Sequence, residues 1–418
     1  MHHVIIGNGP AGVIAAETIR KTAPRDLITL VGDEPVPPYS RMAIPYLLTG
    51  SIGESGTYLR KGERHWAEQR IELVCARAES IDTTLRSVRL SNGQLLAYDR
   101  LLIASGSRPV APPIPGIDLP DVHHCWTLED ARRIIGKTPK GARVLQLGAG
   151  FIGCIIMESL AMRGVALTVV EAGNRMVPRM MTEGAGGLIR AWCERKGIRV
   201  HVNARAEAIE NAGGHMRARL SNGTVLEADL IIAATGVKPN IGFLAGSGIA
   251  CEEGVLVDAS MQTNVPGVYA AGDVSQSLDF STGKRTVNAI QPVAADEARV
   301  AALNMAGRRA TSSGSLSMNV LDTLGLVSSS FGQWWGAPAA EGGDFAELKD
   351  EAAFRYLRLE FKDDALIGAT ALGLTEHVGA IRGLIQTRAR LGAWKARLKA
   401  DPTRLMEAYL ATAQAASA

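Results

Sequence analysis

Two stretches of the chain share one pattern of apolar and polar positions. Each begins with a short apolar run, Val4-Ile5-Ile6 in the first and Val144 to Leu147 in the second. A glycine-rich turn, a helical stretch and a second apolar run follow in both. Short apolar runs bounded by turn residues predict buried parallel strands, and the helical stretches between them predict crossovers. The pattern therefore predicts two βαβ units in separate parts of the chain.

The turns of the two units have the same glycine spacing. They are Gly7-Asn8-Gly9-Pro10-Ala11-Gly12 and Gly148-Ala149-Gly150-Phe151-Ile152-Gly153. Glycine permits a tight strand-to-helix turn and lets the backbone approach a pyrophosphate, while the helix N-terminus supplies unpaired N–H groups. These turns predict two sites for dinucleotides.

An acidic residue closes the second apolar run of each unit, about 20 residues after the glycines, as such a site requires. Leu27 to Val31 leads to Asp33, and Ala166 to Val170 leads to Glu171. A carboxylate at this position accepts hydrogen bonds from a ribose diol. One glycine motif alone is weak evidence, but two complete units favour a protein that binds two dinucleotides and passes electrons between them.

Composition and charge exclude several classes of function. The 418 residues are 46% apolar and 21% charged, which is typical of a globular protein of two to four domains. The net charge is +3 and no basic tract is interleaved with aromatic residues, so we expect no nucleic-acid partner. No apolar run has the length of a membrane span, and the first strand begins by His3, which leaves no room for a signal peptide. We expect a cytoplasmic protein with no membrane partner.

The five cysteines do not form a recognisable centre. Each lies more than four residues from the next, and no CxxC pair is present. We therefore expect reduced, scattered thiols and no metal site.

With these motifs the chain resembles the FAD-dependent pyridine nucleotide–disulfide oxidoreductase superfamily. It is most similar to the branch that contains NADH oxidases, flavin subunits of nitrite reductases, and ferredoxin or rubredoxin reductases. The resemblance implies an α/β fold with two Rossmann-like three-layer nucleotide-binding domains plus a small α+β C-terminal domain. It implies an FAD-binding domain in two parts (residues 1–110 and 241–314), an NADH-binding domain (111–240) and a C-terminal interface domain (315–418).

The resemblance also implies which residues hold the cofactors. Arg41 matches an arginine that reaches the FAD phosphates, Asp273 a carboxylate on the ribityl chain, and the helix expected from Val293 points at the flavin. The implied FAD residues are Gly7, Gly9, Pro10, Ala11, Gly12, Asp33, Glu34, Arg41, Ala104, Ser105, Gly106, Gly272, Asp273 and Val293. The implied NADH residues are Gly148, Gly150, Phe151, Ile152, Gly153, Glu171, Ala234, Thr235 and Gly236.

Simpler structural roles remain open for three of these residues. Asp273 is also compatible with a turn or helix-cap carboxylate, and Arg41 with a surface arginine. Phe151 occupies the position of an aromatic gate over the flavin, which we favour, and core packing at a helix start is the alternative. No residue is expected to act as a conventional catalytic acid or base, because hydride transfer to the flavin depends on positioning.

Met42 indicates whether the chain resembles the thiol-using members of the superfamily. Thiol-using members have a redox cysteine at this place, and a thioether forms neither a mixed disulfide nor a thiolate. The resemblance thus implies an enzyme without a redox-active cysteine. Members of the ferredoxin-reductase type carry a lysine and a glutamate where this chain has Tyr46 and Ile155, so their ion pair beside the flavin is missing here.

The acceptor of the electrons stays open at this stage. Glu171 favours NADH because it repels the 2′-phosphate of NADPH, although Arg175 could offset part of this preference. A small iron–sulfur protein, oxygen, or a larger system such as nitrite or arsenite metabolism would each suit the flavin. A non-catalytic NADH-sensing module is the alternative of a different class. The basic stretch Val378 to Ala400 could dock an acidic partner or form a solvated helix face, and the chain is expected to be a monomer or homodimer.

Overall fold

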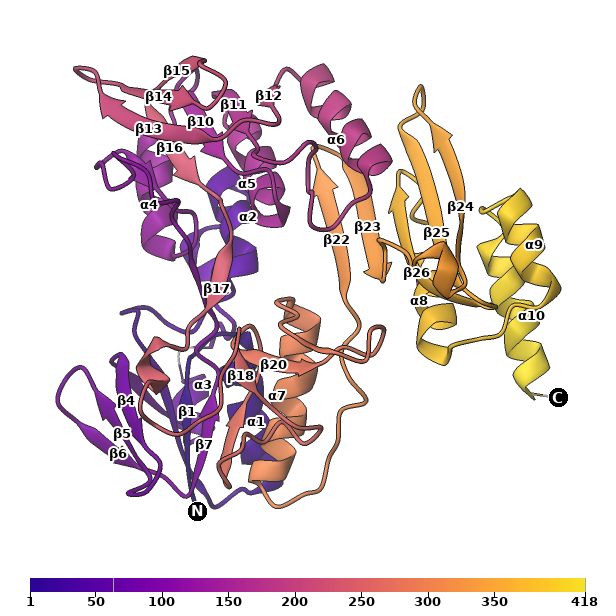
Figure 1. The fold of residues 1–418 in the computed structure, drawn as a ribbon. Coiled ribbons are helices and arrows are strands. Elements are labelled where there is room, and N and C mark those ends of the chain that lie inside the picture. Colours follow the sequence, from indigo (N-terminus) through magenta and orange to yellow (C-terminus); the bar gives the residue numbers. More distant parts are fainter. Residues whose placement is uncertain (63, 418) are drawn as a thin grey trace. The chain divides into compact units, whose positions relative to one another are not determined.

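The computed structural model describes residues 1–62 and 64–417. The chain divides into two compact units, each assembled from separate segments (Figure 1). The first comprises Met1–Leu47, Ile52–Arg108 and Val237–Ser315, and the second comprises Leu48–Ser51, Pro109–Gly236 and Leu316–Ala418. Each unit contains its own parallel sheet.

The parallel sheet of the first unit has the strand order β19-β7-β1-β2-β3. Its central strands consist of buried Val, Ile and Leu side chains, as expected for a sheet covered on both faces. Helices α1 and α7 pack against each other along this sheet (Figure 1). The elements are β1 (His2–Ile6), α1 (Pro10–Thr22), β2 (Leu27–Gly32), β3 (Glu72–Cys75), β7 (Arg100–Ile103), β19 (Val268–Ala270) and α7 (Gln291–Met305).

Helix α7 begins at Gln291, earlier than the expected start at Val293. The reason is Pro292, which fits the first helical turn because no backbone N–H bond is needed there. Val293 is therefore a buried residue of that first turn.

Smaller elements surround this sheet, and α2 runs from the first unit into Leu48 and Thr49 of the second. Strands β4, β5 and β6 form an antiparallel sheet, β18, β20 and β21 form another, and β8 pairs with β17. Their bounds are η1 (Arg41–Ala43), α2 (Ile44–Thr49), η2 (Glu54–Thr57), α3 (His65–Glu68), β4 (Ala78–Asp82), β5 (Ser87–Leu90), β6 (Leu95–Ala97), β8 (Ser107–Pro109), β17 (Val237–Pro239), η3 (Gly242–Leu244), β18 (Val255–Leu256), β20 (Ser275–Leu278) and β21 (Arg285–Thr286).

The second unit repeats the same plan. Its parallel sheet has the order β12-β11-β10-β16-β9. An antiparallel sheet of β13, β14 and β15 accompanies it. The bounds are β9 (Val122–His123), α4 (Leu128–Lys137), β10 (Arg143–Leu147), α5 (Phe151–Met162), β11 (Ala166–Val170), α6 (Glu183–Arg195), β12 (Arg199–His201), β13 (Ala206–Asn211), β14 (Met216–Leu220), β15 (Val225–Ala228) and β16 (Leu230–Ala233).

The proline-rich stretch before β9 is packed rather than free. Ile114, Ile117 and Leu119 lie against the buried core of the second unit, beside residues such as Ile209 and Leu145. Apolar residues spaced among the prolines provide this contact, so the stretch is part of the unit.

The C-terminal segment of the second unit forms an antiparallel sheet in the order β22-β23-β26-β25-β24, with α8 packed on β23 and β26. Its elements are β22 (Met318–Thr323), β23 (Leu326–Gly332), η4 (Ala339–Glu341), β24 (Gly343–Asp350), β25 (Arg355–Lys362), β26 (Ala365–Leu372), α8 (Val378–Thr387), α9 (Ala393–Ala400) and α10 (Leu405–Ser417). Among the described residues, no helix has the length and apolar character to cross a bilayer.

Candidate cofactor-binding sites

The expected FAD residues gather at one edge of the first unit's sheet. Because the strands are parallel, the residues that follow their carboxyl ends meet at the same edge. Gly7 follows β1, Asp33 follows β2, Ala104 follows β7 and Gly272 follows β19. The chain proceeds from β1 to β2 on one side and returns through β7 on the other, and such a switch point is where open α/β sheets bind ligands.

The glycines of this edge fit a pyrophosphate. A Cβ on Gly7 would lie 2.0 Å from the carbonyl oxygen of Ala104, and one on Gly12 would lie 1.9 Å from that of Gly7, so both positions require glycine. A Cβ on Gly9 would meet nothing within 4 Å. Gly9 is the N-cap of α1 and no side chain caps the helix. The open space therefore borders free N–H groups at a positive helix end, which fits the phosphates of FAD.

A cluster next to this cradle holds the loop after β2. The hydroxyl of Tyr39 donates to Glu34 Oε2 at 2.7 Å, and the guanidinium of Arg41 donates to Glu34 Oε1 at 3.0 Å. Arg41 Nη1 also lies 4.0 Å from the position of a Cβ on Gly106. Arg41 thus extends from the loop after β2 to the loop after β7, which supports its proposed role on the FAD phosphates.

Asp273 is half-buried at the same edge. Ser107 donates to its Oδ2 at 2.7 Å. Burial raises the pKa of Asp273, while the Ser107 hydrogen bond and the charge of Arg41 oppose this rise. A half-buried carboxylate at this edge is suited to accept hydrogen bonds from the ribityl hydroxyls.

Ser105 and Thr235 lie in the loops that follow strands β7 and β16. The Ser105 hydroxyl donates to Asn240 O at 3.0 Å within the first unit, and the Thr235 hydroxyl donates to Val110 O at 2.5 Å within the second. Both hydroxyl protons are used by backbone carbonyls. These residues fix the loops that carry Gly106 and Gly236, and their remaining lone pairs can only accept hydrogen bonds.

The second unit contains a closely matching cradle. A Cβ on Gly148 would lie 2.4 Å from Ala234 O, and one on Gly153 would lie 2.6 Å from Gly148 O. Gly150 faces open space and is the uncapped N-cap of α5, with φ −75° and ψ −170°, compared with −74° and −172° for Gly9. The same backbone geometry in both units fits two dinucleotides.

Glu171 is 9% exposed and joins the end of β11 to this cradle. One carboxylate oxygen accepts from the N–H of Ala149 at 2.7 Å and the other from the N–H of Gly173 at 2.8 Å. Each oxygen keeps a lone pair for a ribose hydroxyl. Glu171 therefore shapes the glycine turn and also offers the acceptor expected for NADH.

The guanidinium of Arg175, which could offset part of the charge of Glu171, is hydrogen-bonded within its own loop. It donates to Met181 O at 2.9 Å, to Pro178 O at 3.0 Å and to Asn174 Oδ1 at 2.8 Å. The sequence could not reveal these bonds, since they depend on how the loop folds.

Arg179 lies in the same loop and was missed by sequence reasoning. It is exposed, and its Nη2 lies 3.5 Å from the position of a Cβ on Gly236, which has φ +116°. A cation beside this glycine adds positive charge at the carboxyl edge of the sheet, where the pyrophosphate of a dinucleotide lies.

Phe151 and Ile152 form the first turn of α5 and are both partly exposed. This exposure is compatible with the proposed gate.

His123 belongs to β9 and is buried, whereas His124 Nδ1 donates to Ala233 O at 2.9 Å. His123 is thus the last residue of the edge strand β9, and His124 follows it beside the carboxyl end of β16.

Met42, at the expected position of a redox cysteine, lies in η1 and is 48% exposed. Burial raises the pKa of the Cys125 and Cys193 thiols to about 12, so these stay protonated. Cys75 is exposed, and its Sγ lies 3.7 Å from Glu34 O. The absence of a redox cysteine stays a prediction. Within the described residues no group of His, Cys, Asp or Glu is arranged to hold a metal ion.

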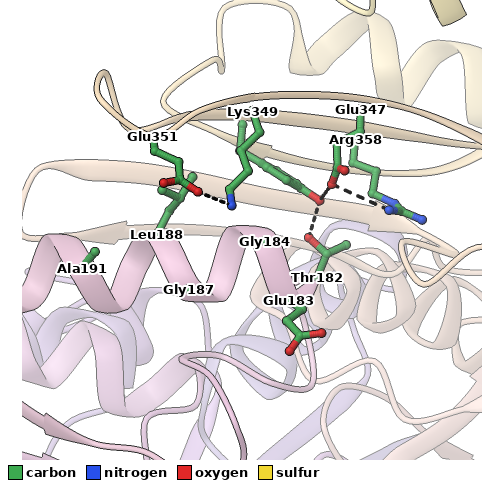
Figure 2. Close-up of a pocket in the computed structure, with 11 residues that line it drawn as sticks. Thr182, Glu183, Gly184, Gly187, Leu188, Ala191, Glu347, Lys349, Glu351 and Arg358 are labelled. Atoms are coloured by element: carbon green, nitrogen blue, oxygen red, sulfur yellow. Dashed lines mark hydrogen bonds and ion pairs between the residues drawn. The ribbon is translucent and has the colours of Figure 1, made fainter.

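A cavity of about 550 Å³ lies in the second unit between α6 and the strands β24 and β25 (Figure 2). Four of its charged groups form two ion pairs, Lys349 with Glu351 at 2.5 Å and Arg358 with Glu347 at 3.7 Å. It contains none of the glycine-turn residues. This cavity is therefore not a candidate for either cofactor.

The model of the pyridine nucleotide-disulphide oxidoreductase family matches residues 1–295 of the chain. The chain belongs to this family. Membership confirms the expected superfamily and an oxidoreductase, and with the two parallel sheets it confirms the α/β fold. FAD and NADH are the cofactors that this family membership supports, and the two cradles fit them.

Individual members resemble this oxidoreductase over different lengths. It is 31% identical over 403 residues to the NADH-dependent phenylglyoxylate dehydrogenase subunit epsilon of Aromatoleum evansii, with 96% of this chain and 95% of that protein covered. It is 32% identical over 284 residues to the rubredoxin-NAD(+) reductase of Pseudomonas putida, with 67% and 74% covered. The reductase in the covalent putidaredoxin reductase–putidaredoxin complex shares the fold, with a TM-score of 0.89, 98% of each chain covered and 22% identity.

Proposed function

We propose that this oxidoreductase transfers electrons between NADH and a separate redox protein, of the small iron–sulfur type, through a bound FAD. When bound, FAD accepts a hydride from NADH and releases the electrons to the partner. The observation that carries the proposal is the pair of matching cradles, one in each unit, around Gly9 and Gly150. Two open, uncapped helix N-termini with the same backbone geometry support two dinucleotide phosphates.

The residues of the chain bind and orient the cofactors in this proposal. The carboxylate of Glu171 holds the NADH ribose, and the side chains of Arg41 and Asp273 hold the FAD phosphates and ribityl chain. No side chain is required as a general acid, because hydride carries its own proton. Met42, in place of the redox cysteine, supports a route from NADH to the acceptor without a sulfur intermediate.

The similarity to a rubredoxin-NAD(+) reductase supports a protein partner. A second form of the proposal is that the partner is part of a multisubunit dehydrogenase. It is favoured by the match to a dehydrogenase subunit, which extends over nearly the full length of both proteins. In that form the chain is the NADH-linked subunit of the assembly.

Reoxidation of the reduced holoprotein tests the choice of acceptor. The protein is reduced with one equivalent of NADH under anaerobic conditions and then mixed rapidly with rubredoxin, a [2Fe–2S] ferredoxin, ferricyanide or oxygen. We expect at least one iron–sulfur protein to reoxidise the flavin faster than oxygen does. Faster reoxidation by oxygen would make the chain an NADH oxidase, and a reduced complex that persists in air would make it an NADH sensor; both results contradict the proposal.

A further inference from the structure

Glu297 is a buried carboxylate that the proposed electron transfer does not use. It lies on α7 and is 4% exposed. Its Oε2 accepts from the N–H of Gly272 at 2.9 Å and from the hydroxyl of Ser275 at 2.6 Å. Its Oε1 accepts from the hydroxyl of Ser277 at 2.7 Å. Three donors thus converge on one carboxylate, which compensates for its burial.

The backbone turn that Glu297 holds is part of the FAD cradle. Gly272 has φ +82°, and a Cβ there would lie 3.3 Å from the side chain of Ala11 and 3.4 Å from that of Ala294. The turn is therefore packed between the first turn of α1 and α7. The next residue is Asp273, so the hydrogen bond that the Gly272 N–H donates to Glu297 holds the backbone beside the carboxylate proposed for the ribityl chain.

Glu297 can hold or release a proton without leaving any of these polar groups unsatisfied. The Ser275 hydroxyl lies 2.6 Å from Glu297 Oε2 and 2.9 Å from Gly272 O. When Glu297 is ionised, Ser275 donates to it. When Glu297 is protonated, it donates to Ser275 Oγ, and Ser275 donates to Gly272 O instead. The backbone need not move between the two states.

Burial, hydrogen bonds and a neighbouring charge together set the pKa of Glu297. Burial raises the pKa of Glu297, and the negative charge of Asp273 adds to this rise. The hydrogen bonds from Ser275, Ser277 and Gly272 lower the pKa and so oppose the rise. Asp273 is the charged group that faces Glu297, and Arg41 in turn faces Asp273. Further negative charge in this cradle would therefore favour the protonated form of Glu297.

We propose that Glu297 is a positioning residue of the FAD site that takes up a proton from water when the bound FAD is reduced by NADH. The inference rests on the proposed FAD site. NADH supplies the two electrons and one proton of the hydride and becomes NAD⁺. The additional proton comes from solvent and forms the O–H bond of Glu297, so no further oxidant or reductant takes part.

Proton uptake measured during flavin reduction tests this inference. Anaerobic holoprotein in weak buffer with a pH indicator is mixed with NADH over a series of pH values, and the protons taken up are compared with the flavin absorbance lost. The wild type should take up more protons than Glu297→Gln, with a difference of up to one proton per FAD. Asp296→Asn removes an exposed carboxylate that pairs with Arg299 on the same helix, and it should behave as the wild type.

Ser277→Ala provides a graded second variant. It removes one donor to Glu297 Oε1, which weakens the ionised form, so the pH of maximal uptake should move upward. Equal uptake by the wild type and Glu297→Gln, or a downward move in Ser277→Ala, would overturn the inference. If Glu297→Gln does not fold, the direction of the Ser277→Ala shift decides. A wild type that binds no FAD, or whose FAD is not reduced by NADH, would instead contradict the proposed function.

Discussion

Replacement of Glu171 by glutamine should weaken both the glycine turn and the preference for NADH. The wild-type carboxylate accepts the N–H groups of Ala149 and Gly173 at 2.7 and 2.8 Å. In glutamine one oxygen becomes an NH₂ group that faces an N–H donor, so one of the two bonds is lost. A hydrogen bond to a charged group contributes about 1.5–3 kcal/mol, and we therefore expect the free energy of unfolding to fall by about 2 kcal/mol.

The same change removes the negative charge that repels the 2′-phosphate of NADPH. The wild type should be reduced by NADH at least about tenfold more efficiently than by NADPH, which corresponds to about 1.4 kcal/mol. This preference should be firm because the guanidinium of Arg175 is held by Met181 O and Pro178 O. In Glu171→Gln the ratio of the two rates should narrow toward one.

Anaerobic rapid mixing with each nucleotide measures the ratio, and thermal unfolding of the holoprotein measures the loss of stability. Glu183→Gln is a matched control, because Glu183 is an exposed carboxylate in the first turn of α6. The control should leave the ratio unchanged. Equal or better use of NADPH by the wild type, or an unchanged ratio in Glu171→Gln, would show that Glu171 does not select the nucleotide.

Three further predictions concern the cradles. Gly7→Ala should prevent FAD binding because its Cβ would lie 2.0 Å from a carbonyl oxygen, whereas Gly9→Ala should fold and only weaken FAD binding. The amount of bound FAD per chain measures the difference, and equal FAD content in the two variants would contradict the prediction. Arg179→Gln should weaken binding of NADH and NADPH alike in equilibrium titrations, and the exposed control Arg199→Gln should not. Burial raises the pKa of Glu297, so the stability that this group contributes is present below its unfolded pKa and is lost as pH rises through its folded pKa. The unfolding temperature of Glu297→Gln should therefore fall less steeply with rising pH than that of the wild type. An unchanged slope would contradict this prediction.

The glycine turns could be predicted from the sequence because their chemistry is local. Gly7 and Gly148 are required because a Cβ at either position would overlap the carbonyl oxygen of Ala104 or Ala234. The same requirement for glycine occurs wherever a strand leads into a nucleotide-binding helix. The runs of Val, Ile and Leu likewise predict the parallel strands that bring these turns to one edge.

Contacts between distant segments could not be predicted in this way. Glu297 is on the buried face of α7 with Val293, Ala294 and Ala301, and a carboxylate on an apolar helix face was the one available signal. Its partners on β20 are defined only by the fold. The same applies to Arg175, whose bonds to the carbonyls of its own loop depend on a backbone path that the sequence pattern does not specify.

An anaerobic titration of the purified holoprotein with NADH tests whether a hydride passes directly from NADH to bound FAD without a cysteine relay. We expect release of FAD on denaturation and complete loss of flavin absorbance at one NADH per FAD. Alkylation of accessible thiols should leave the titration unchanged, because Met42 stores no electrons. Uptake of two NADH per FAD, or loss of reduction after alkylation, would show that a cysteine takes part and would contradict direct transfer.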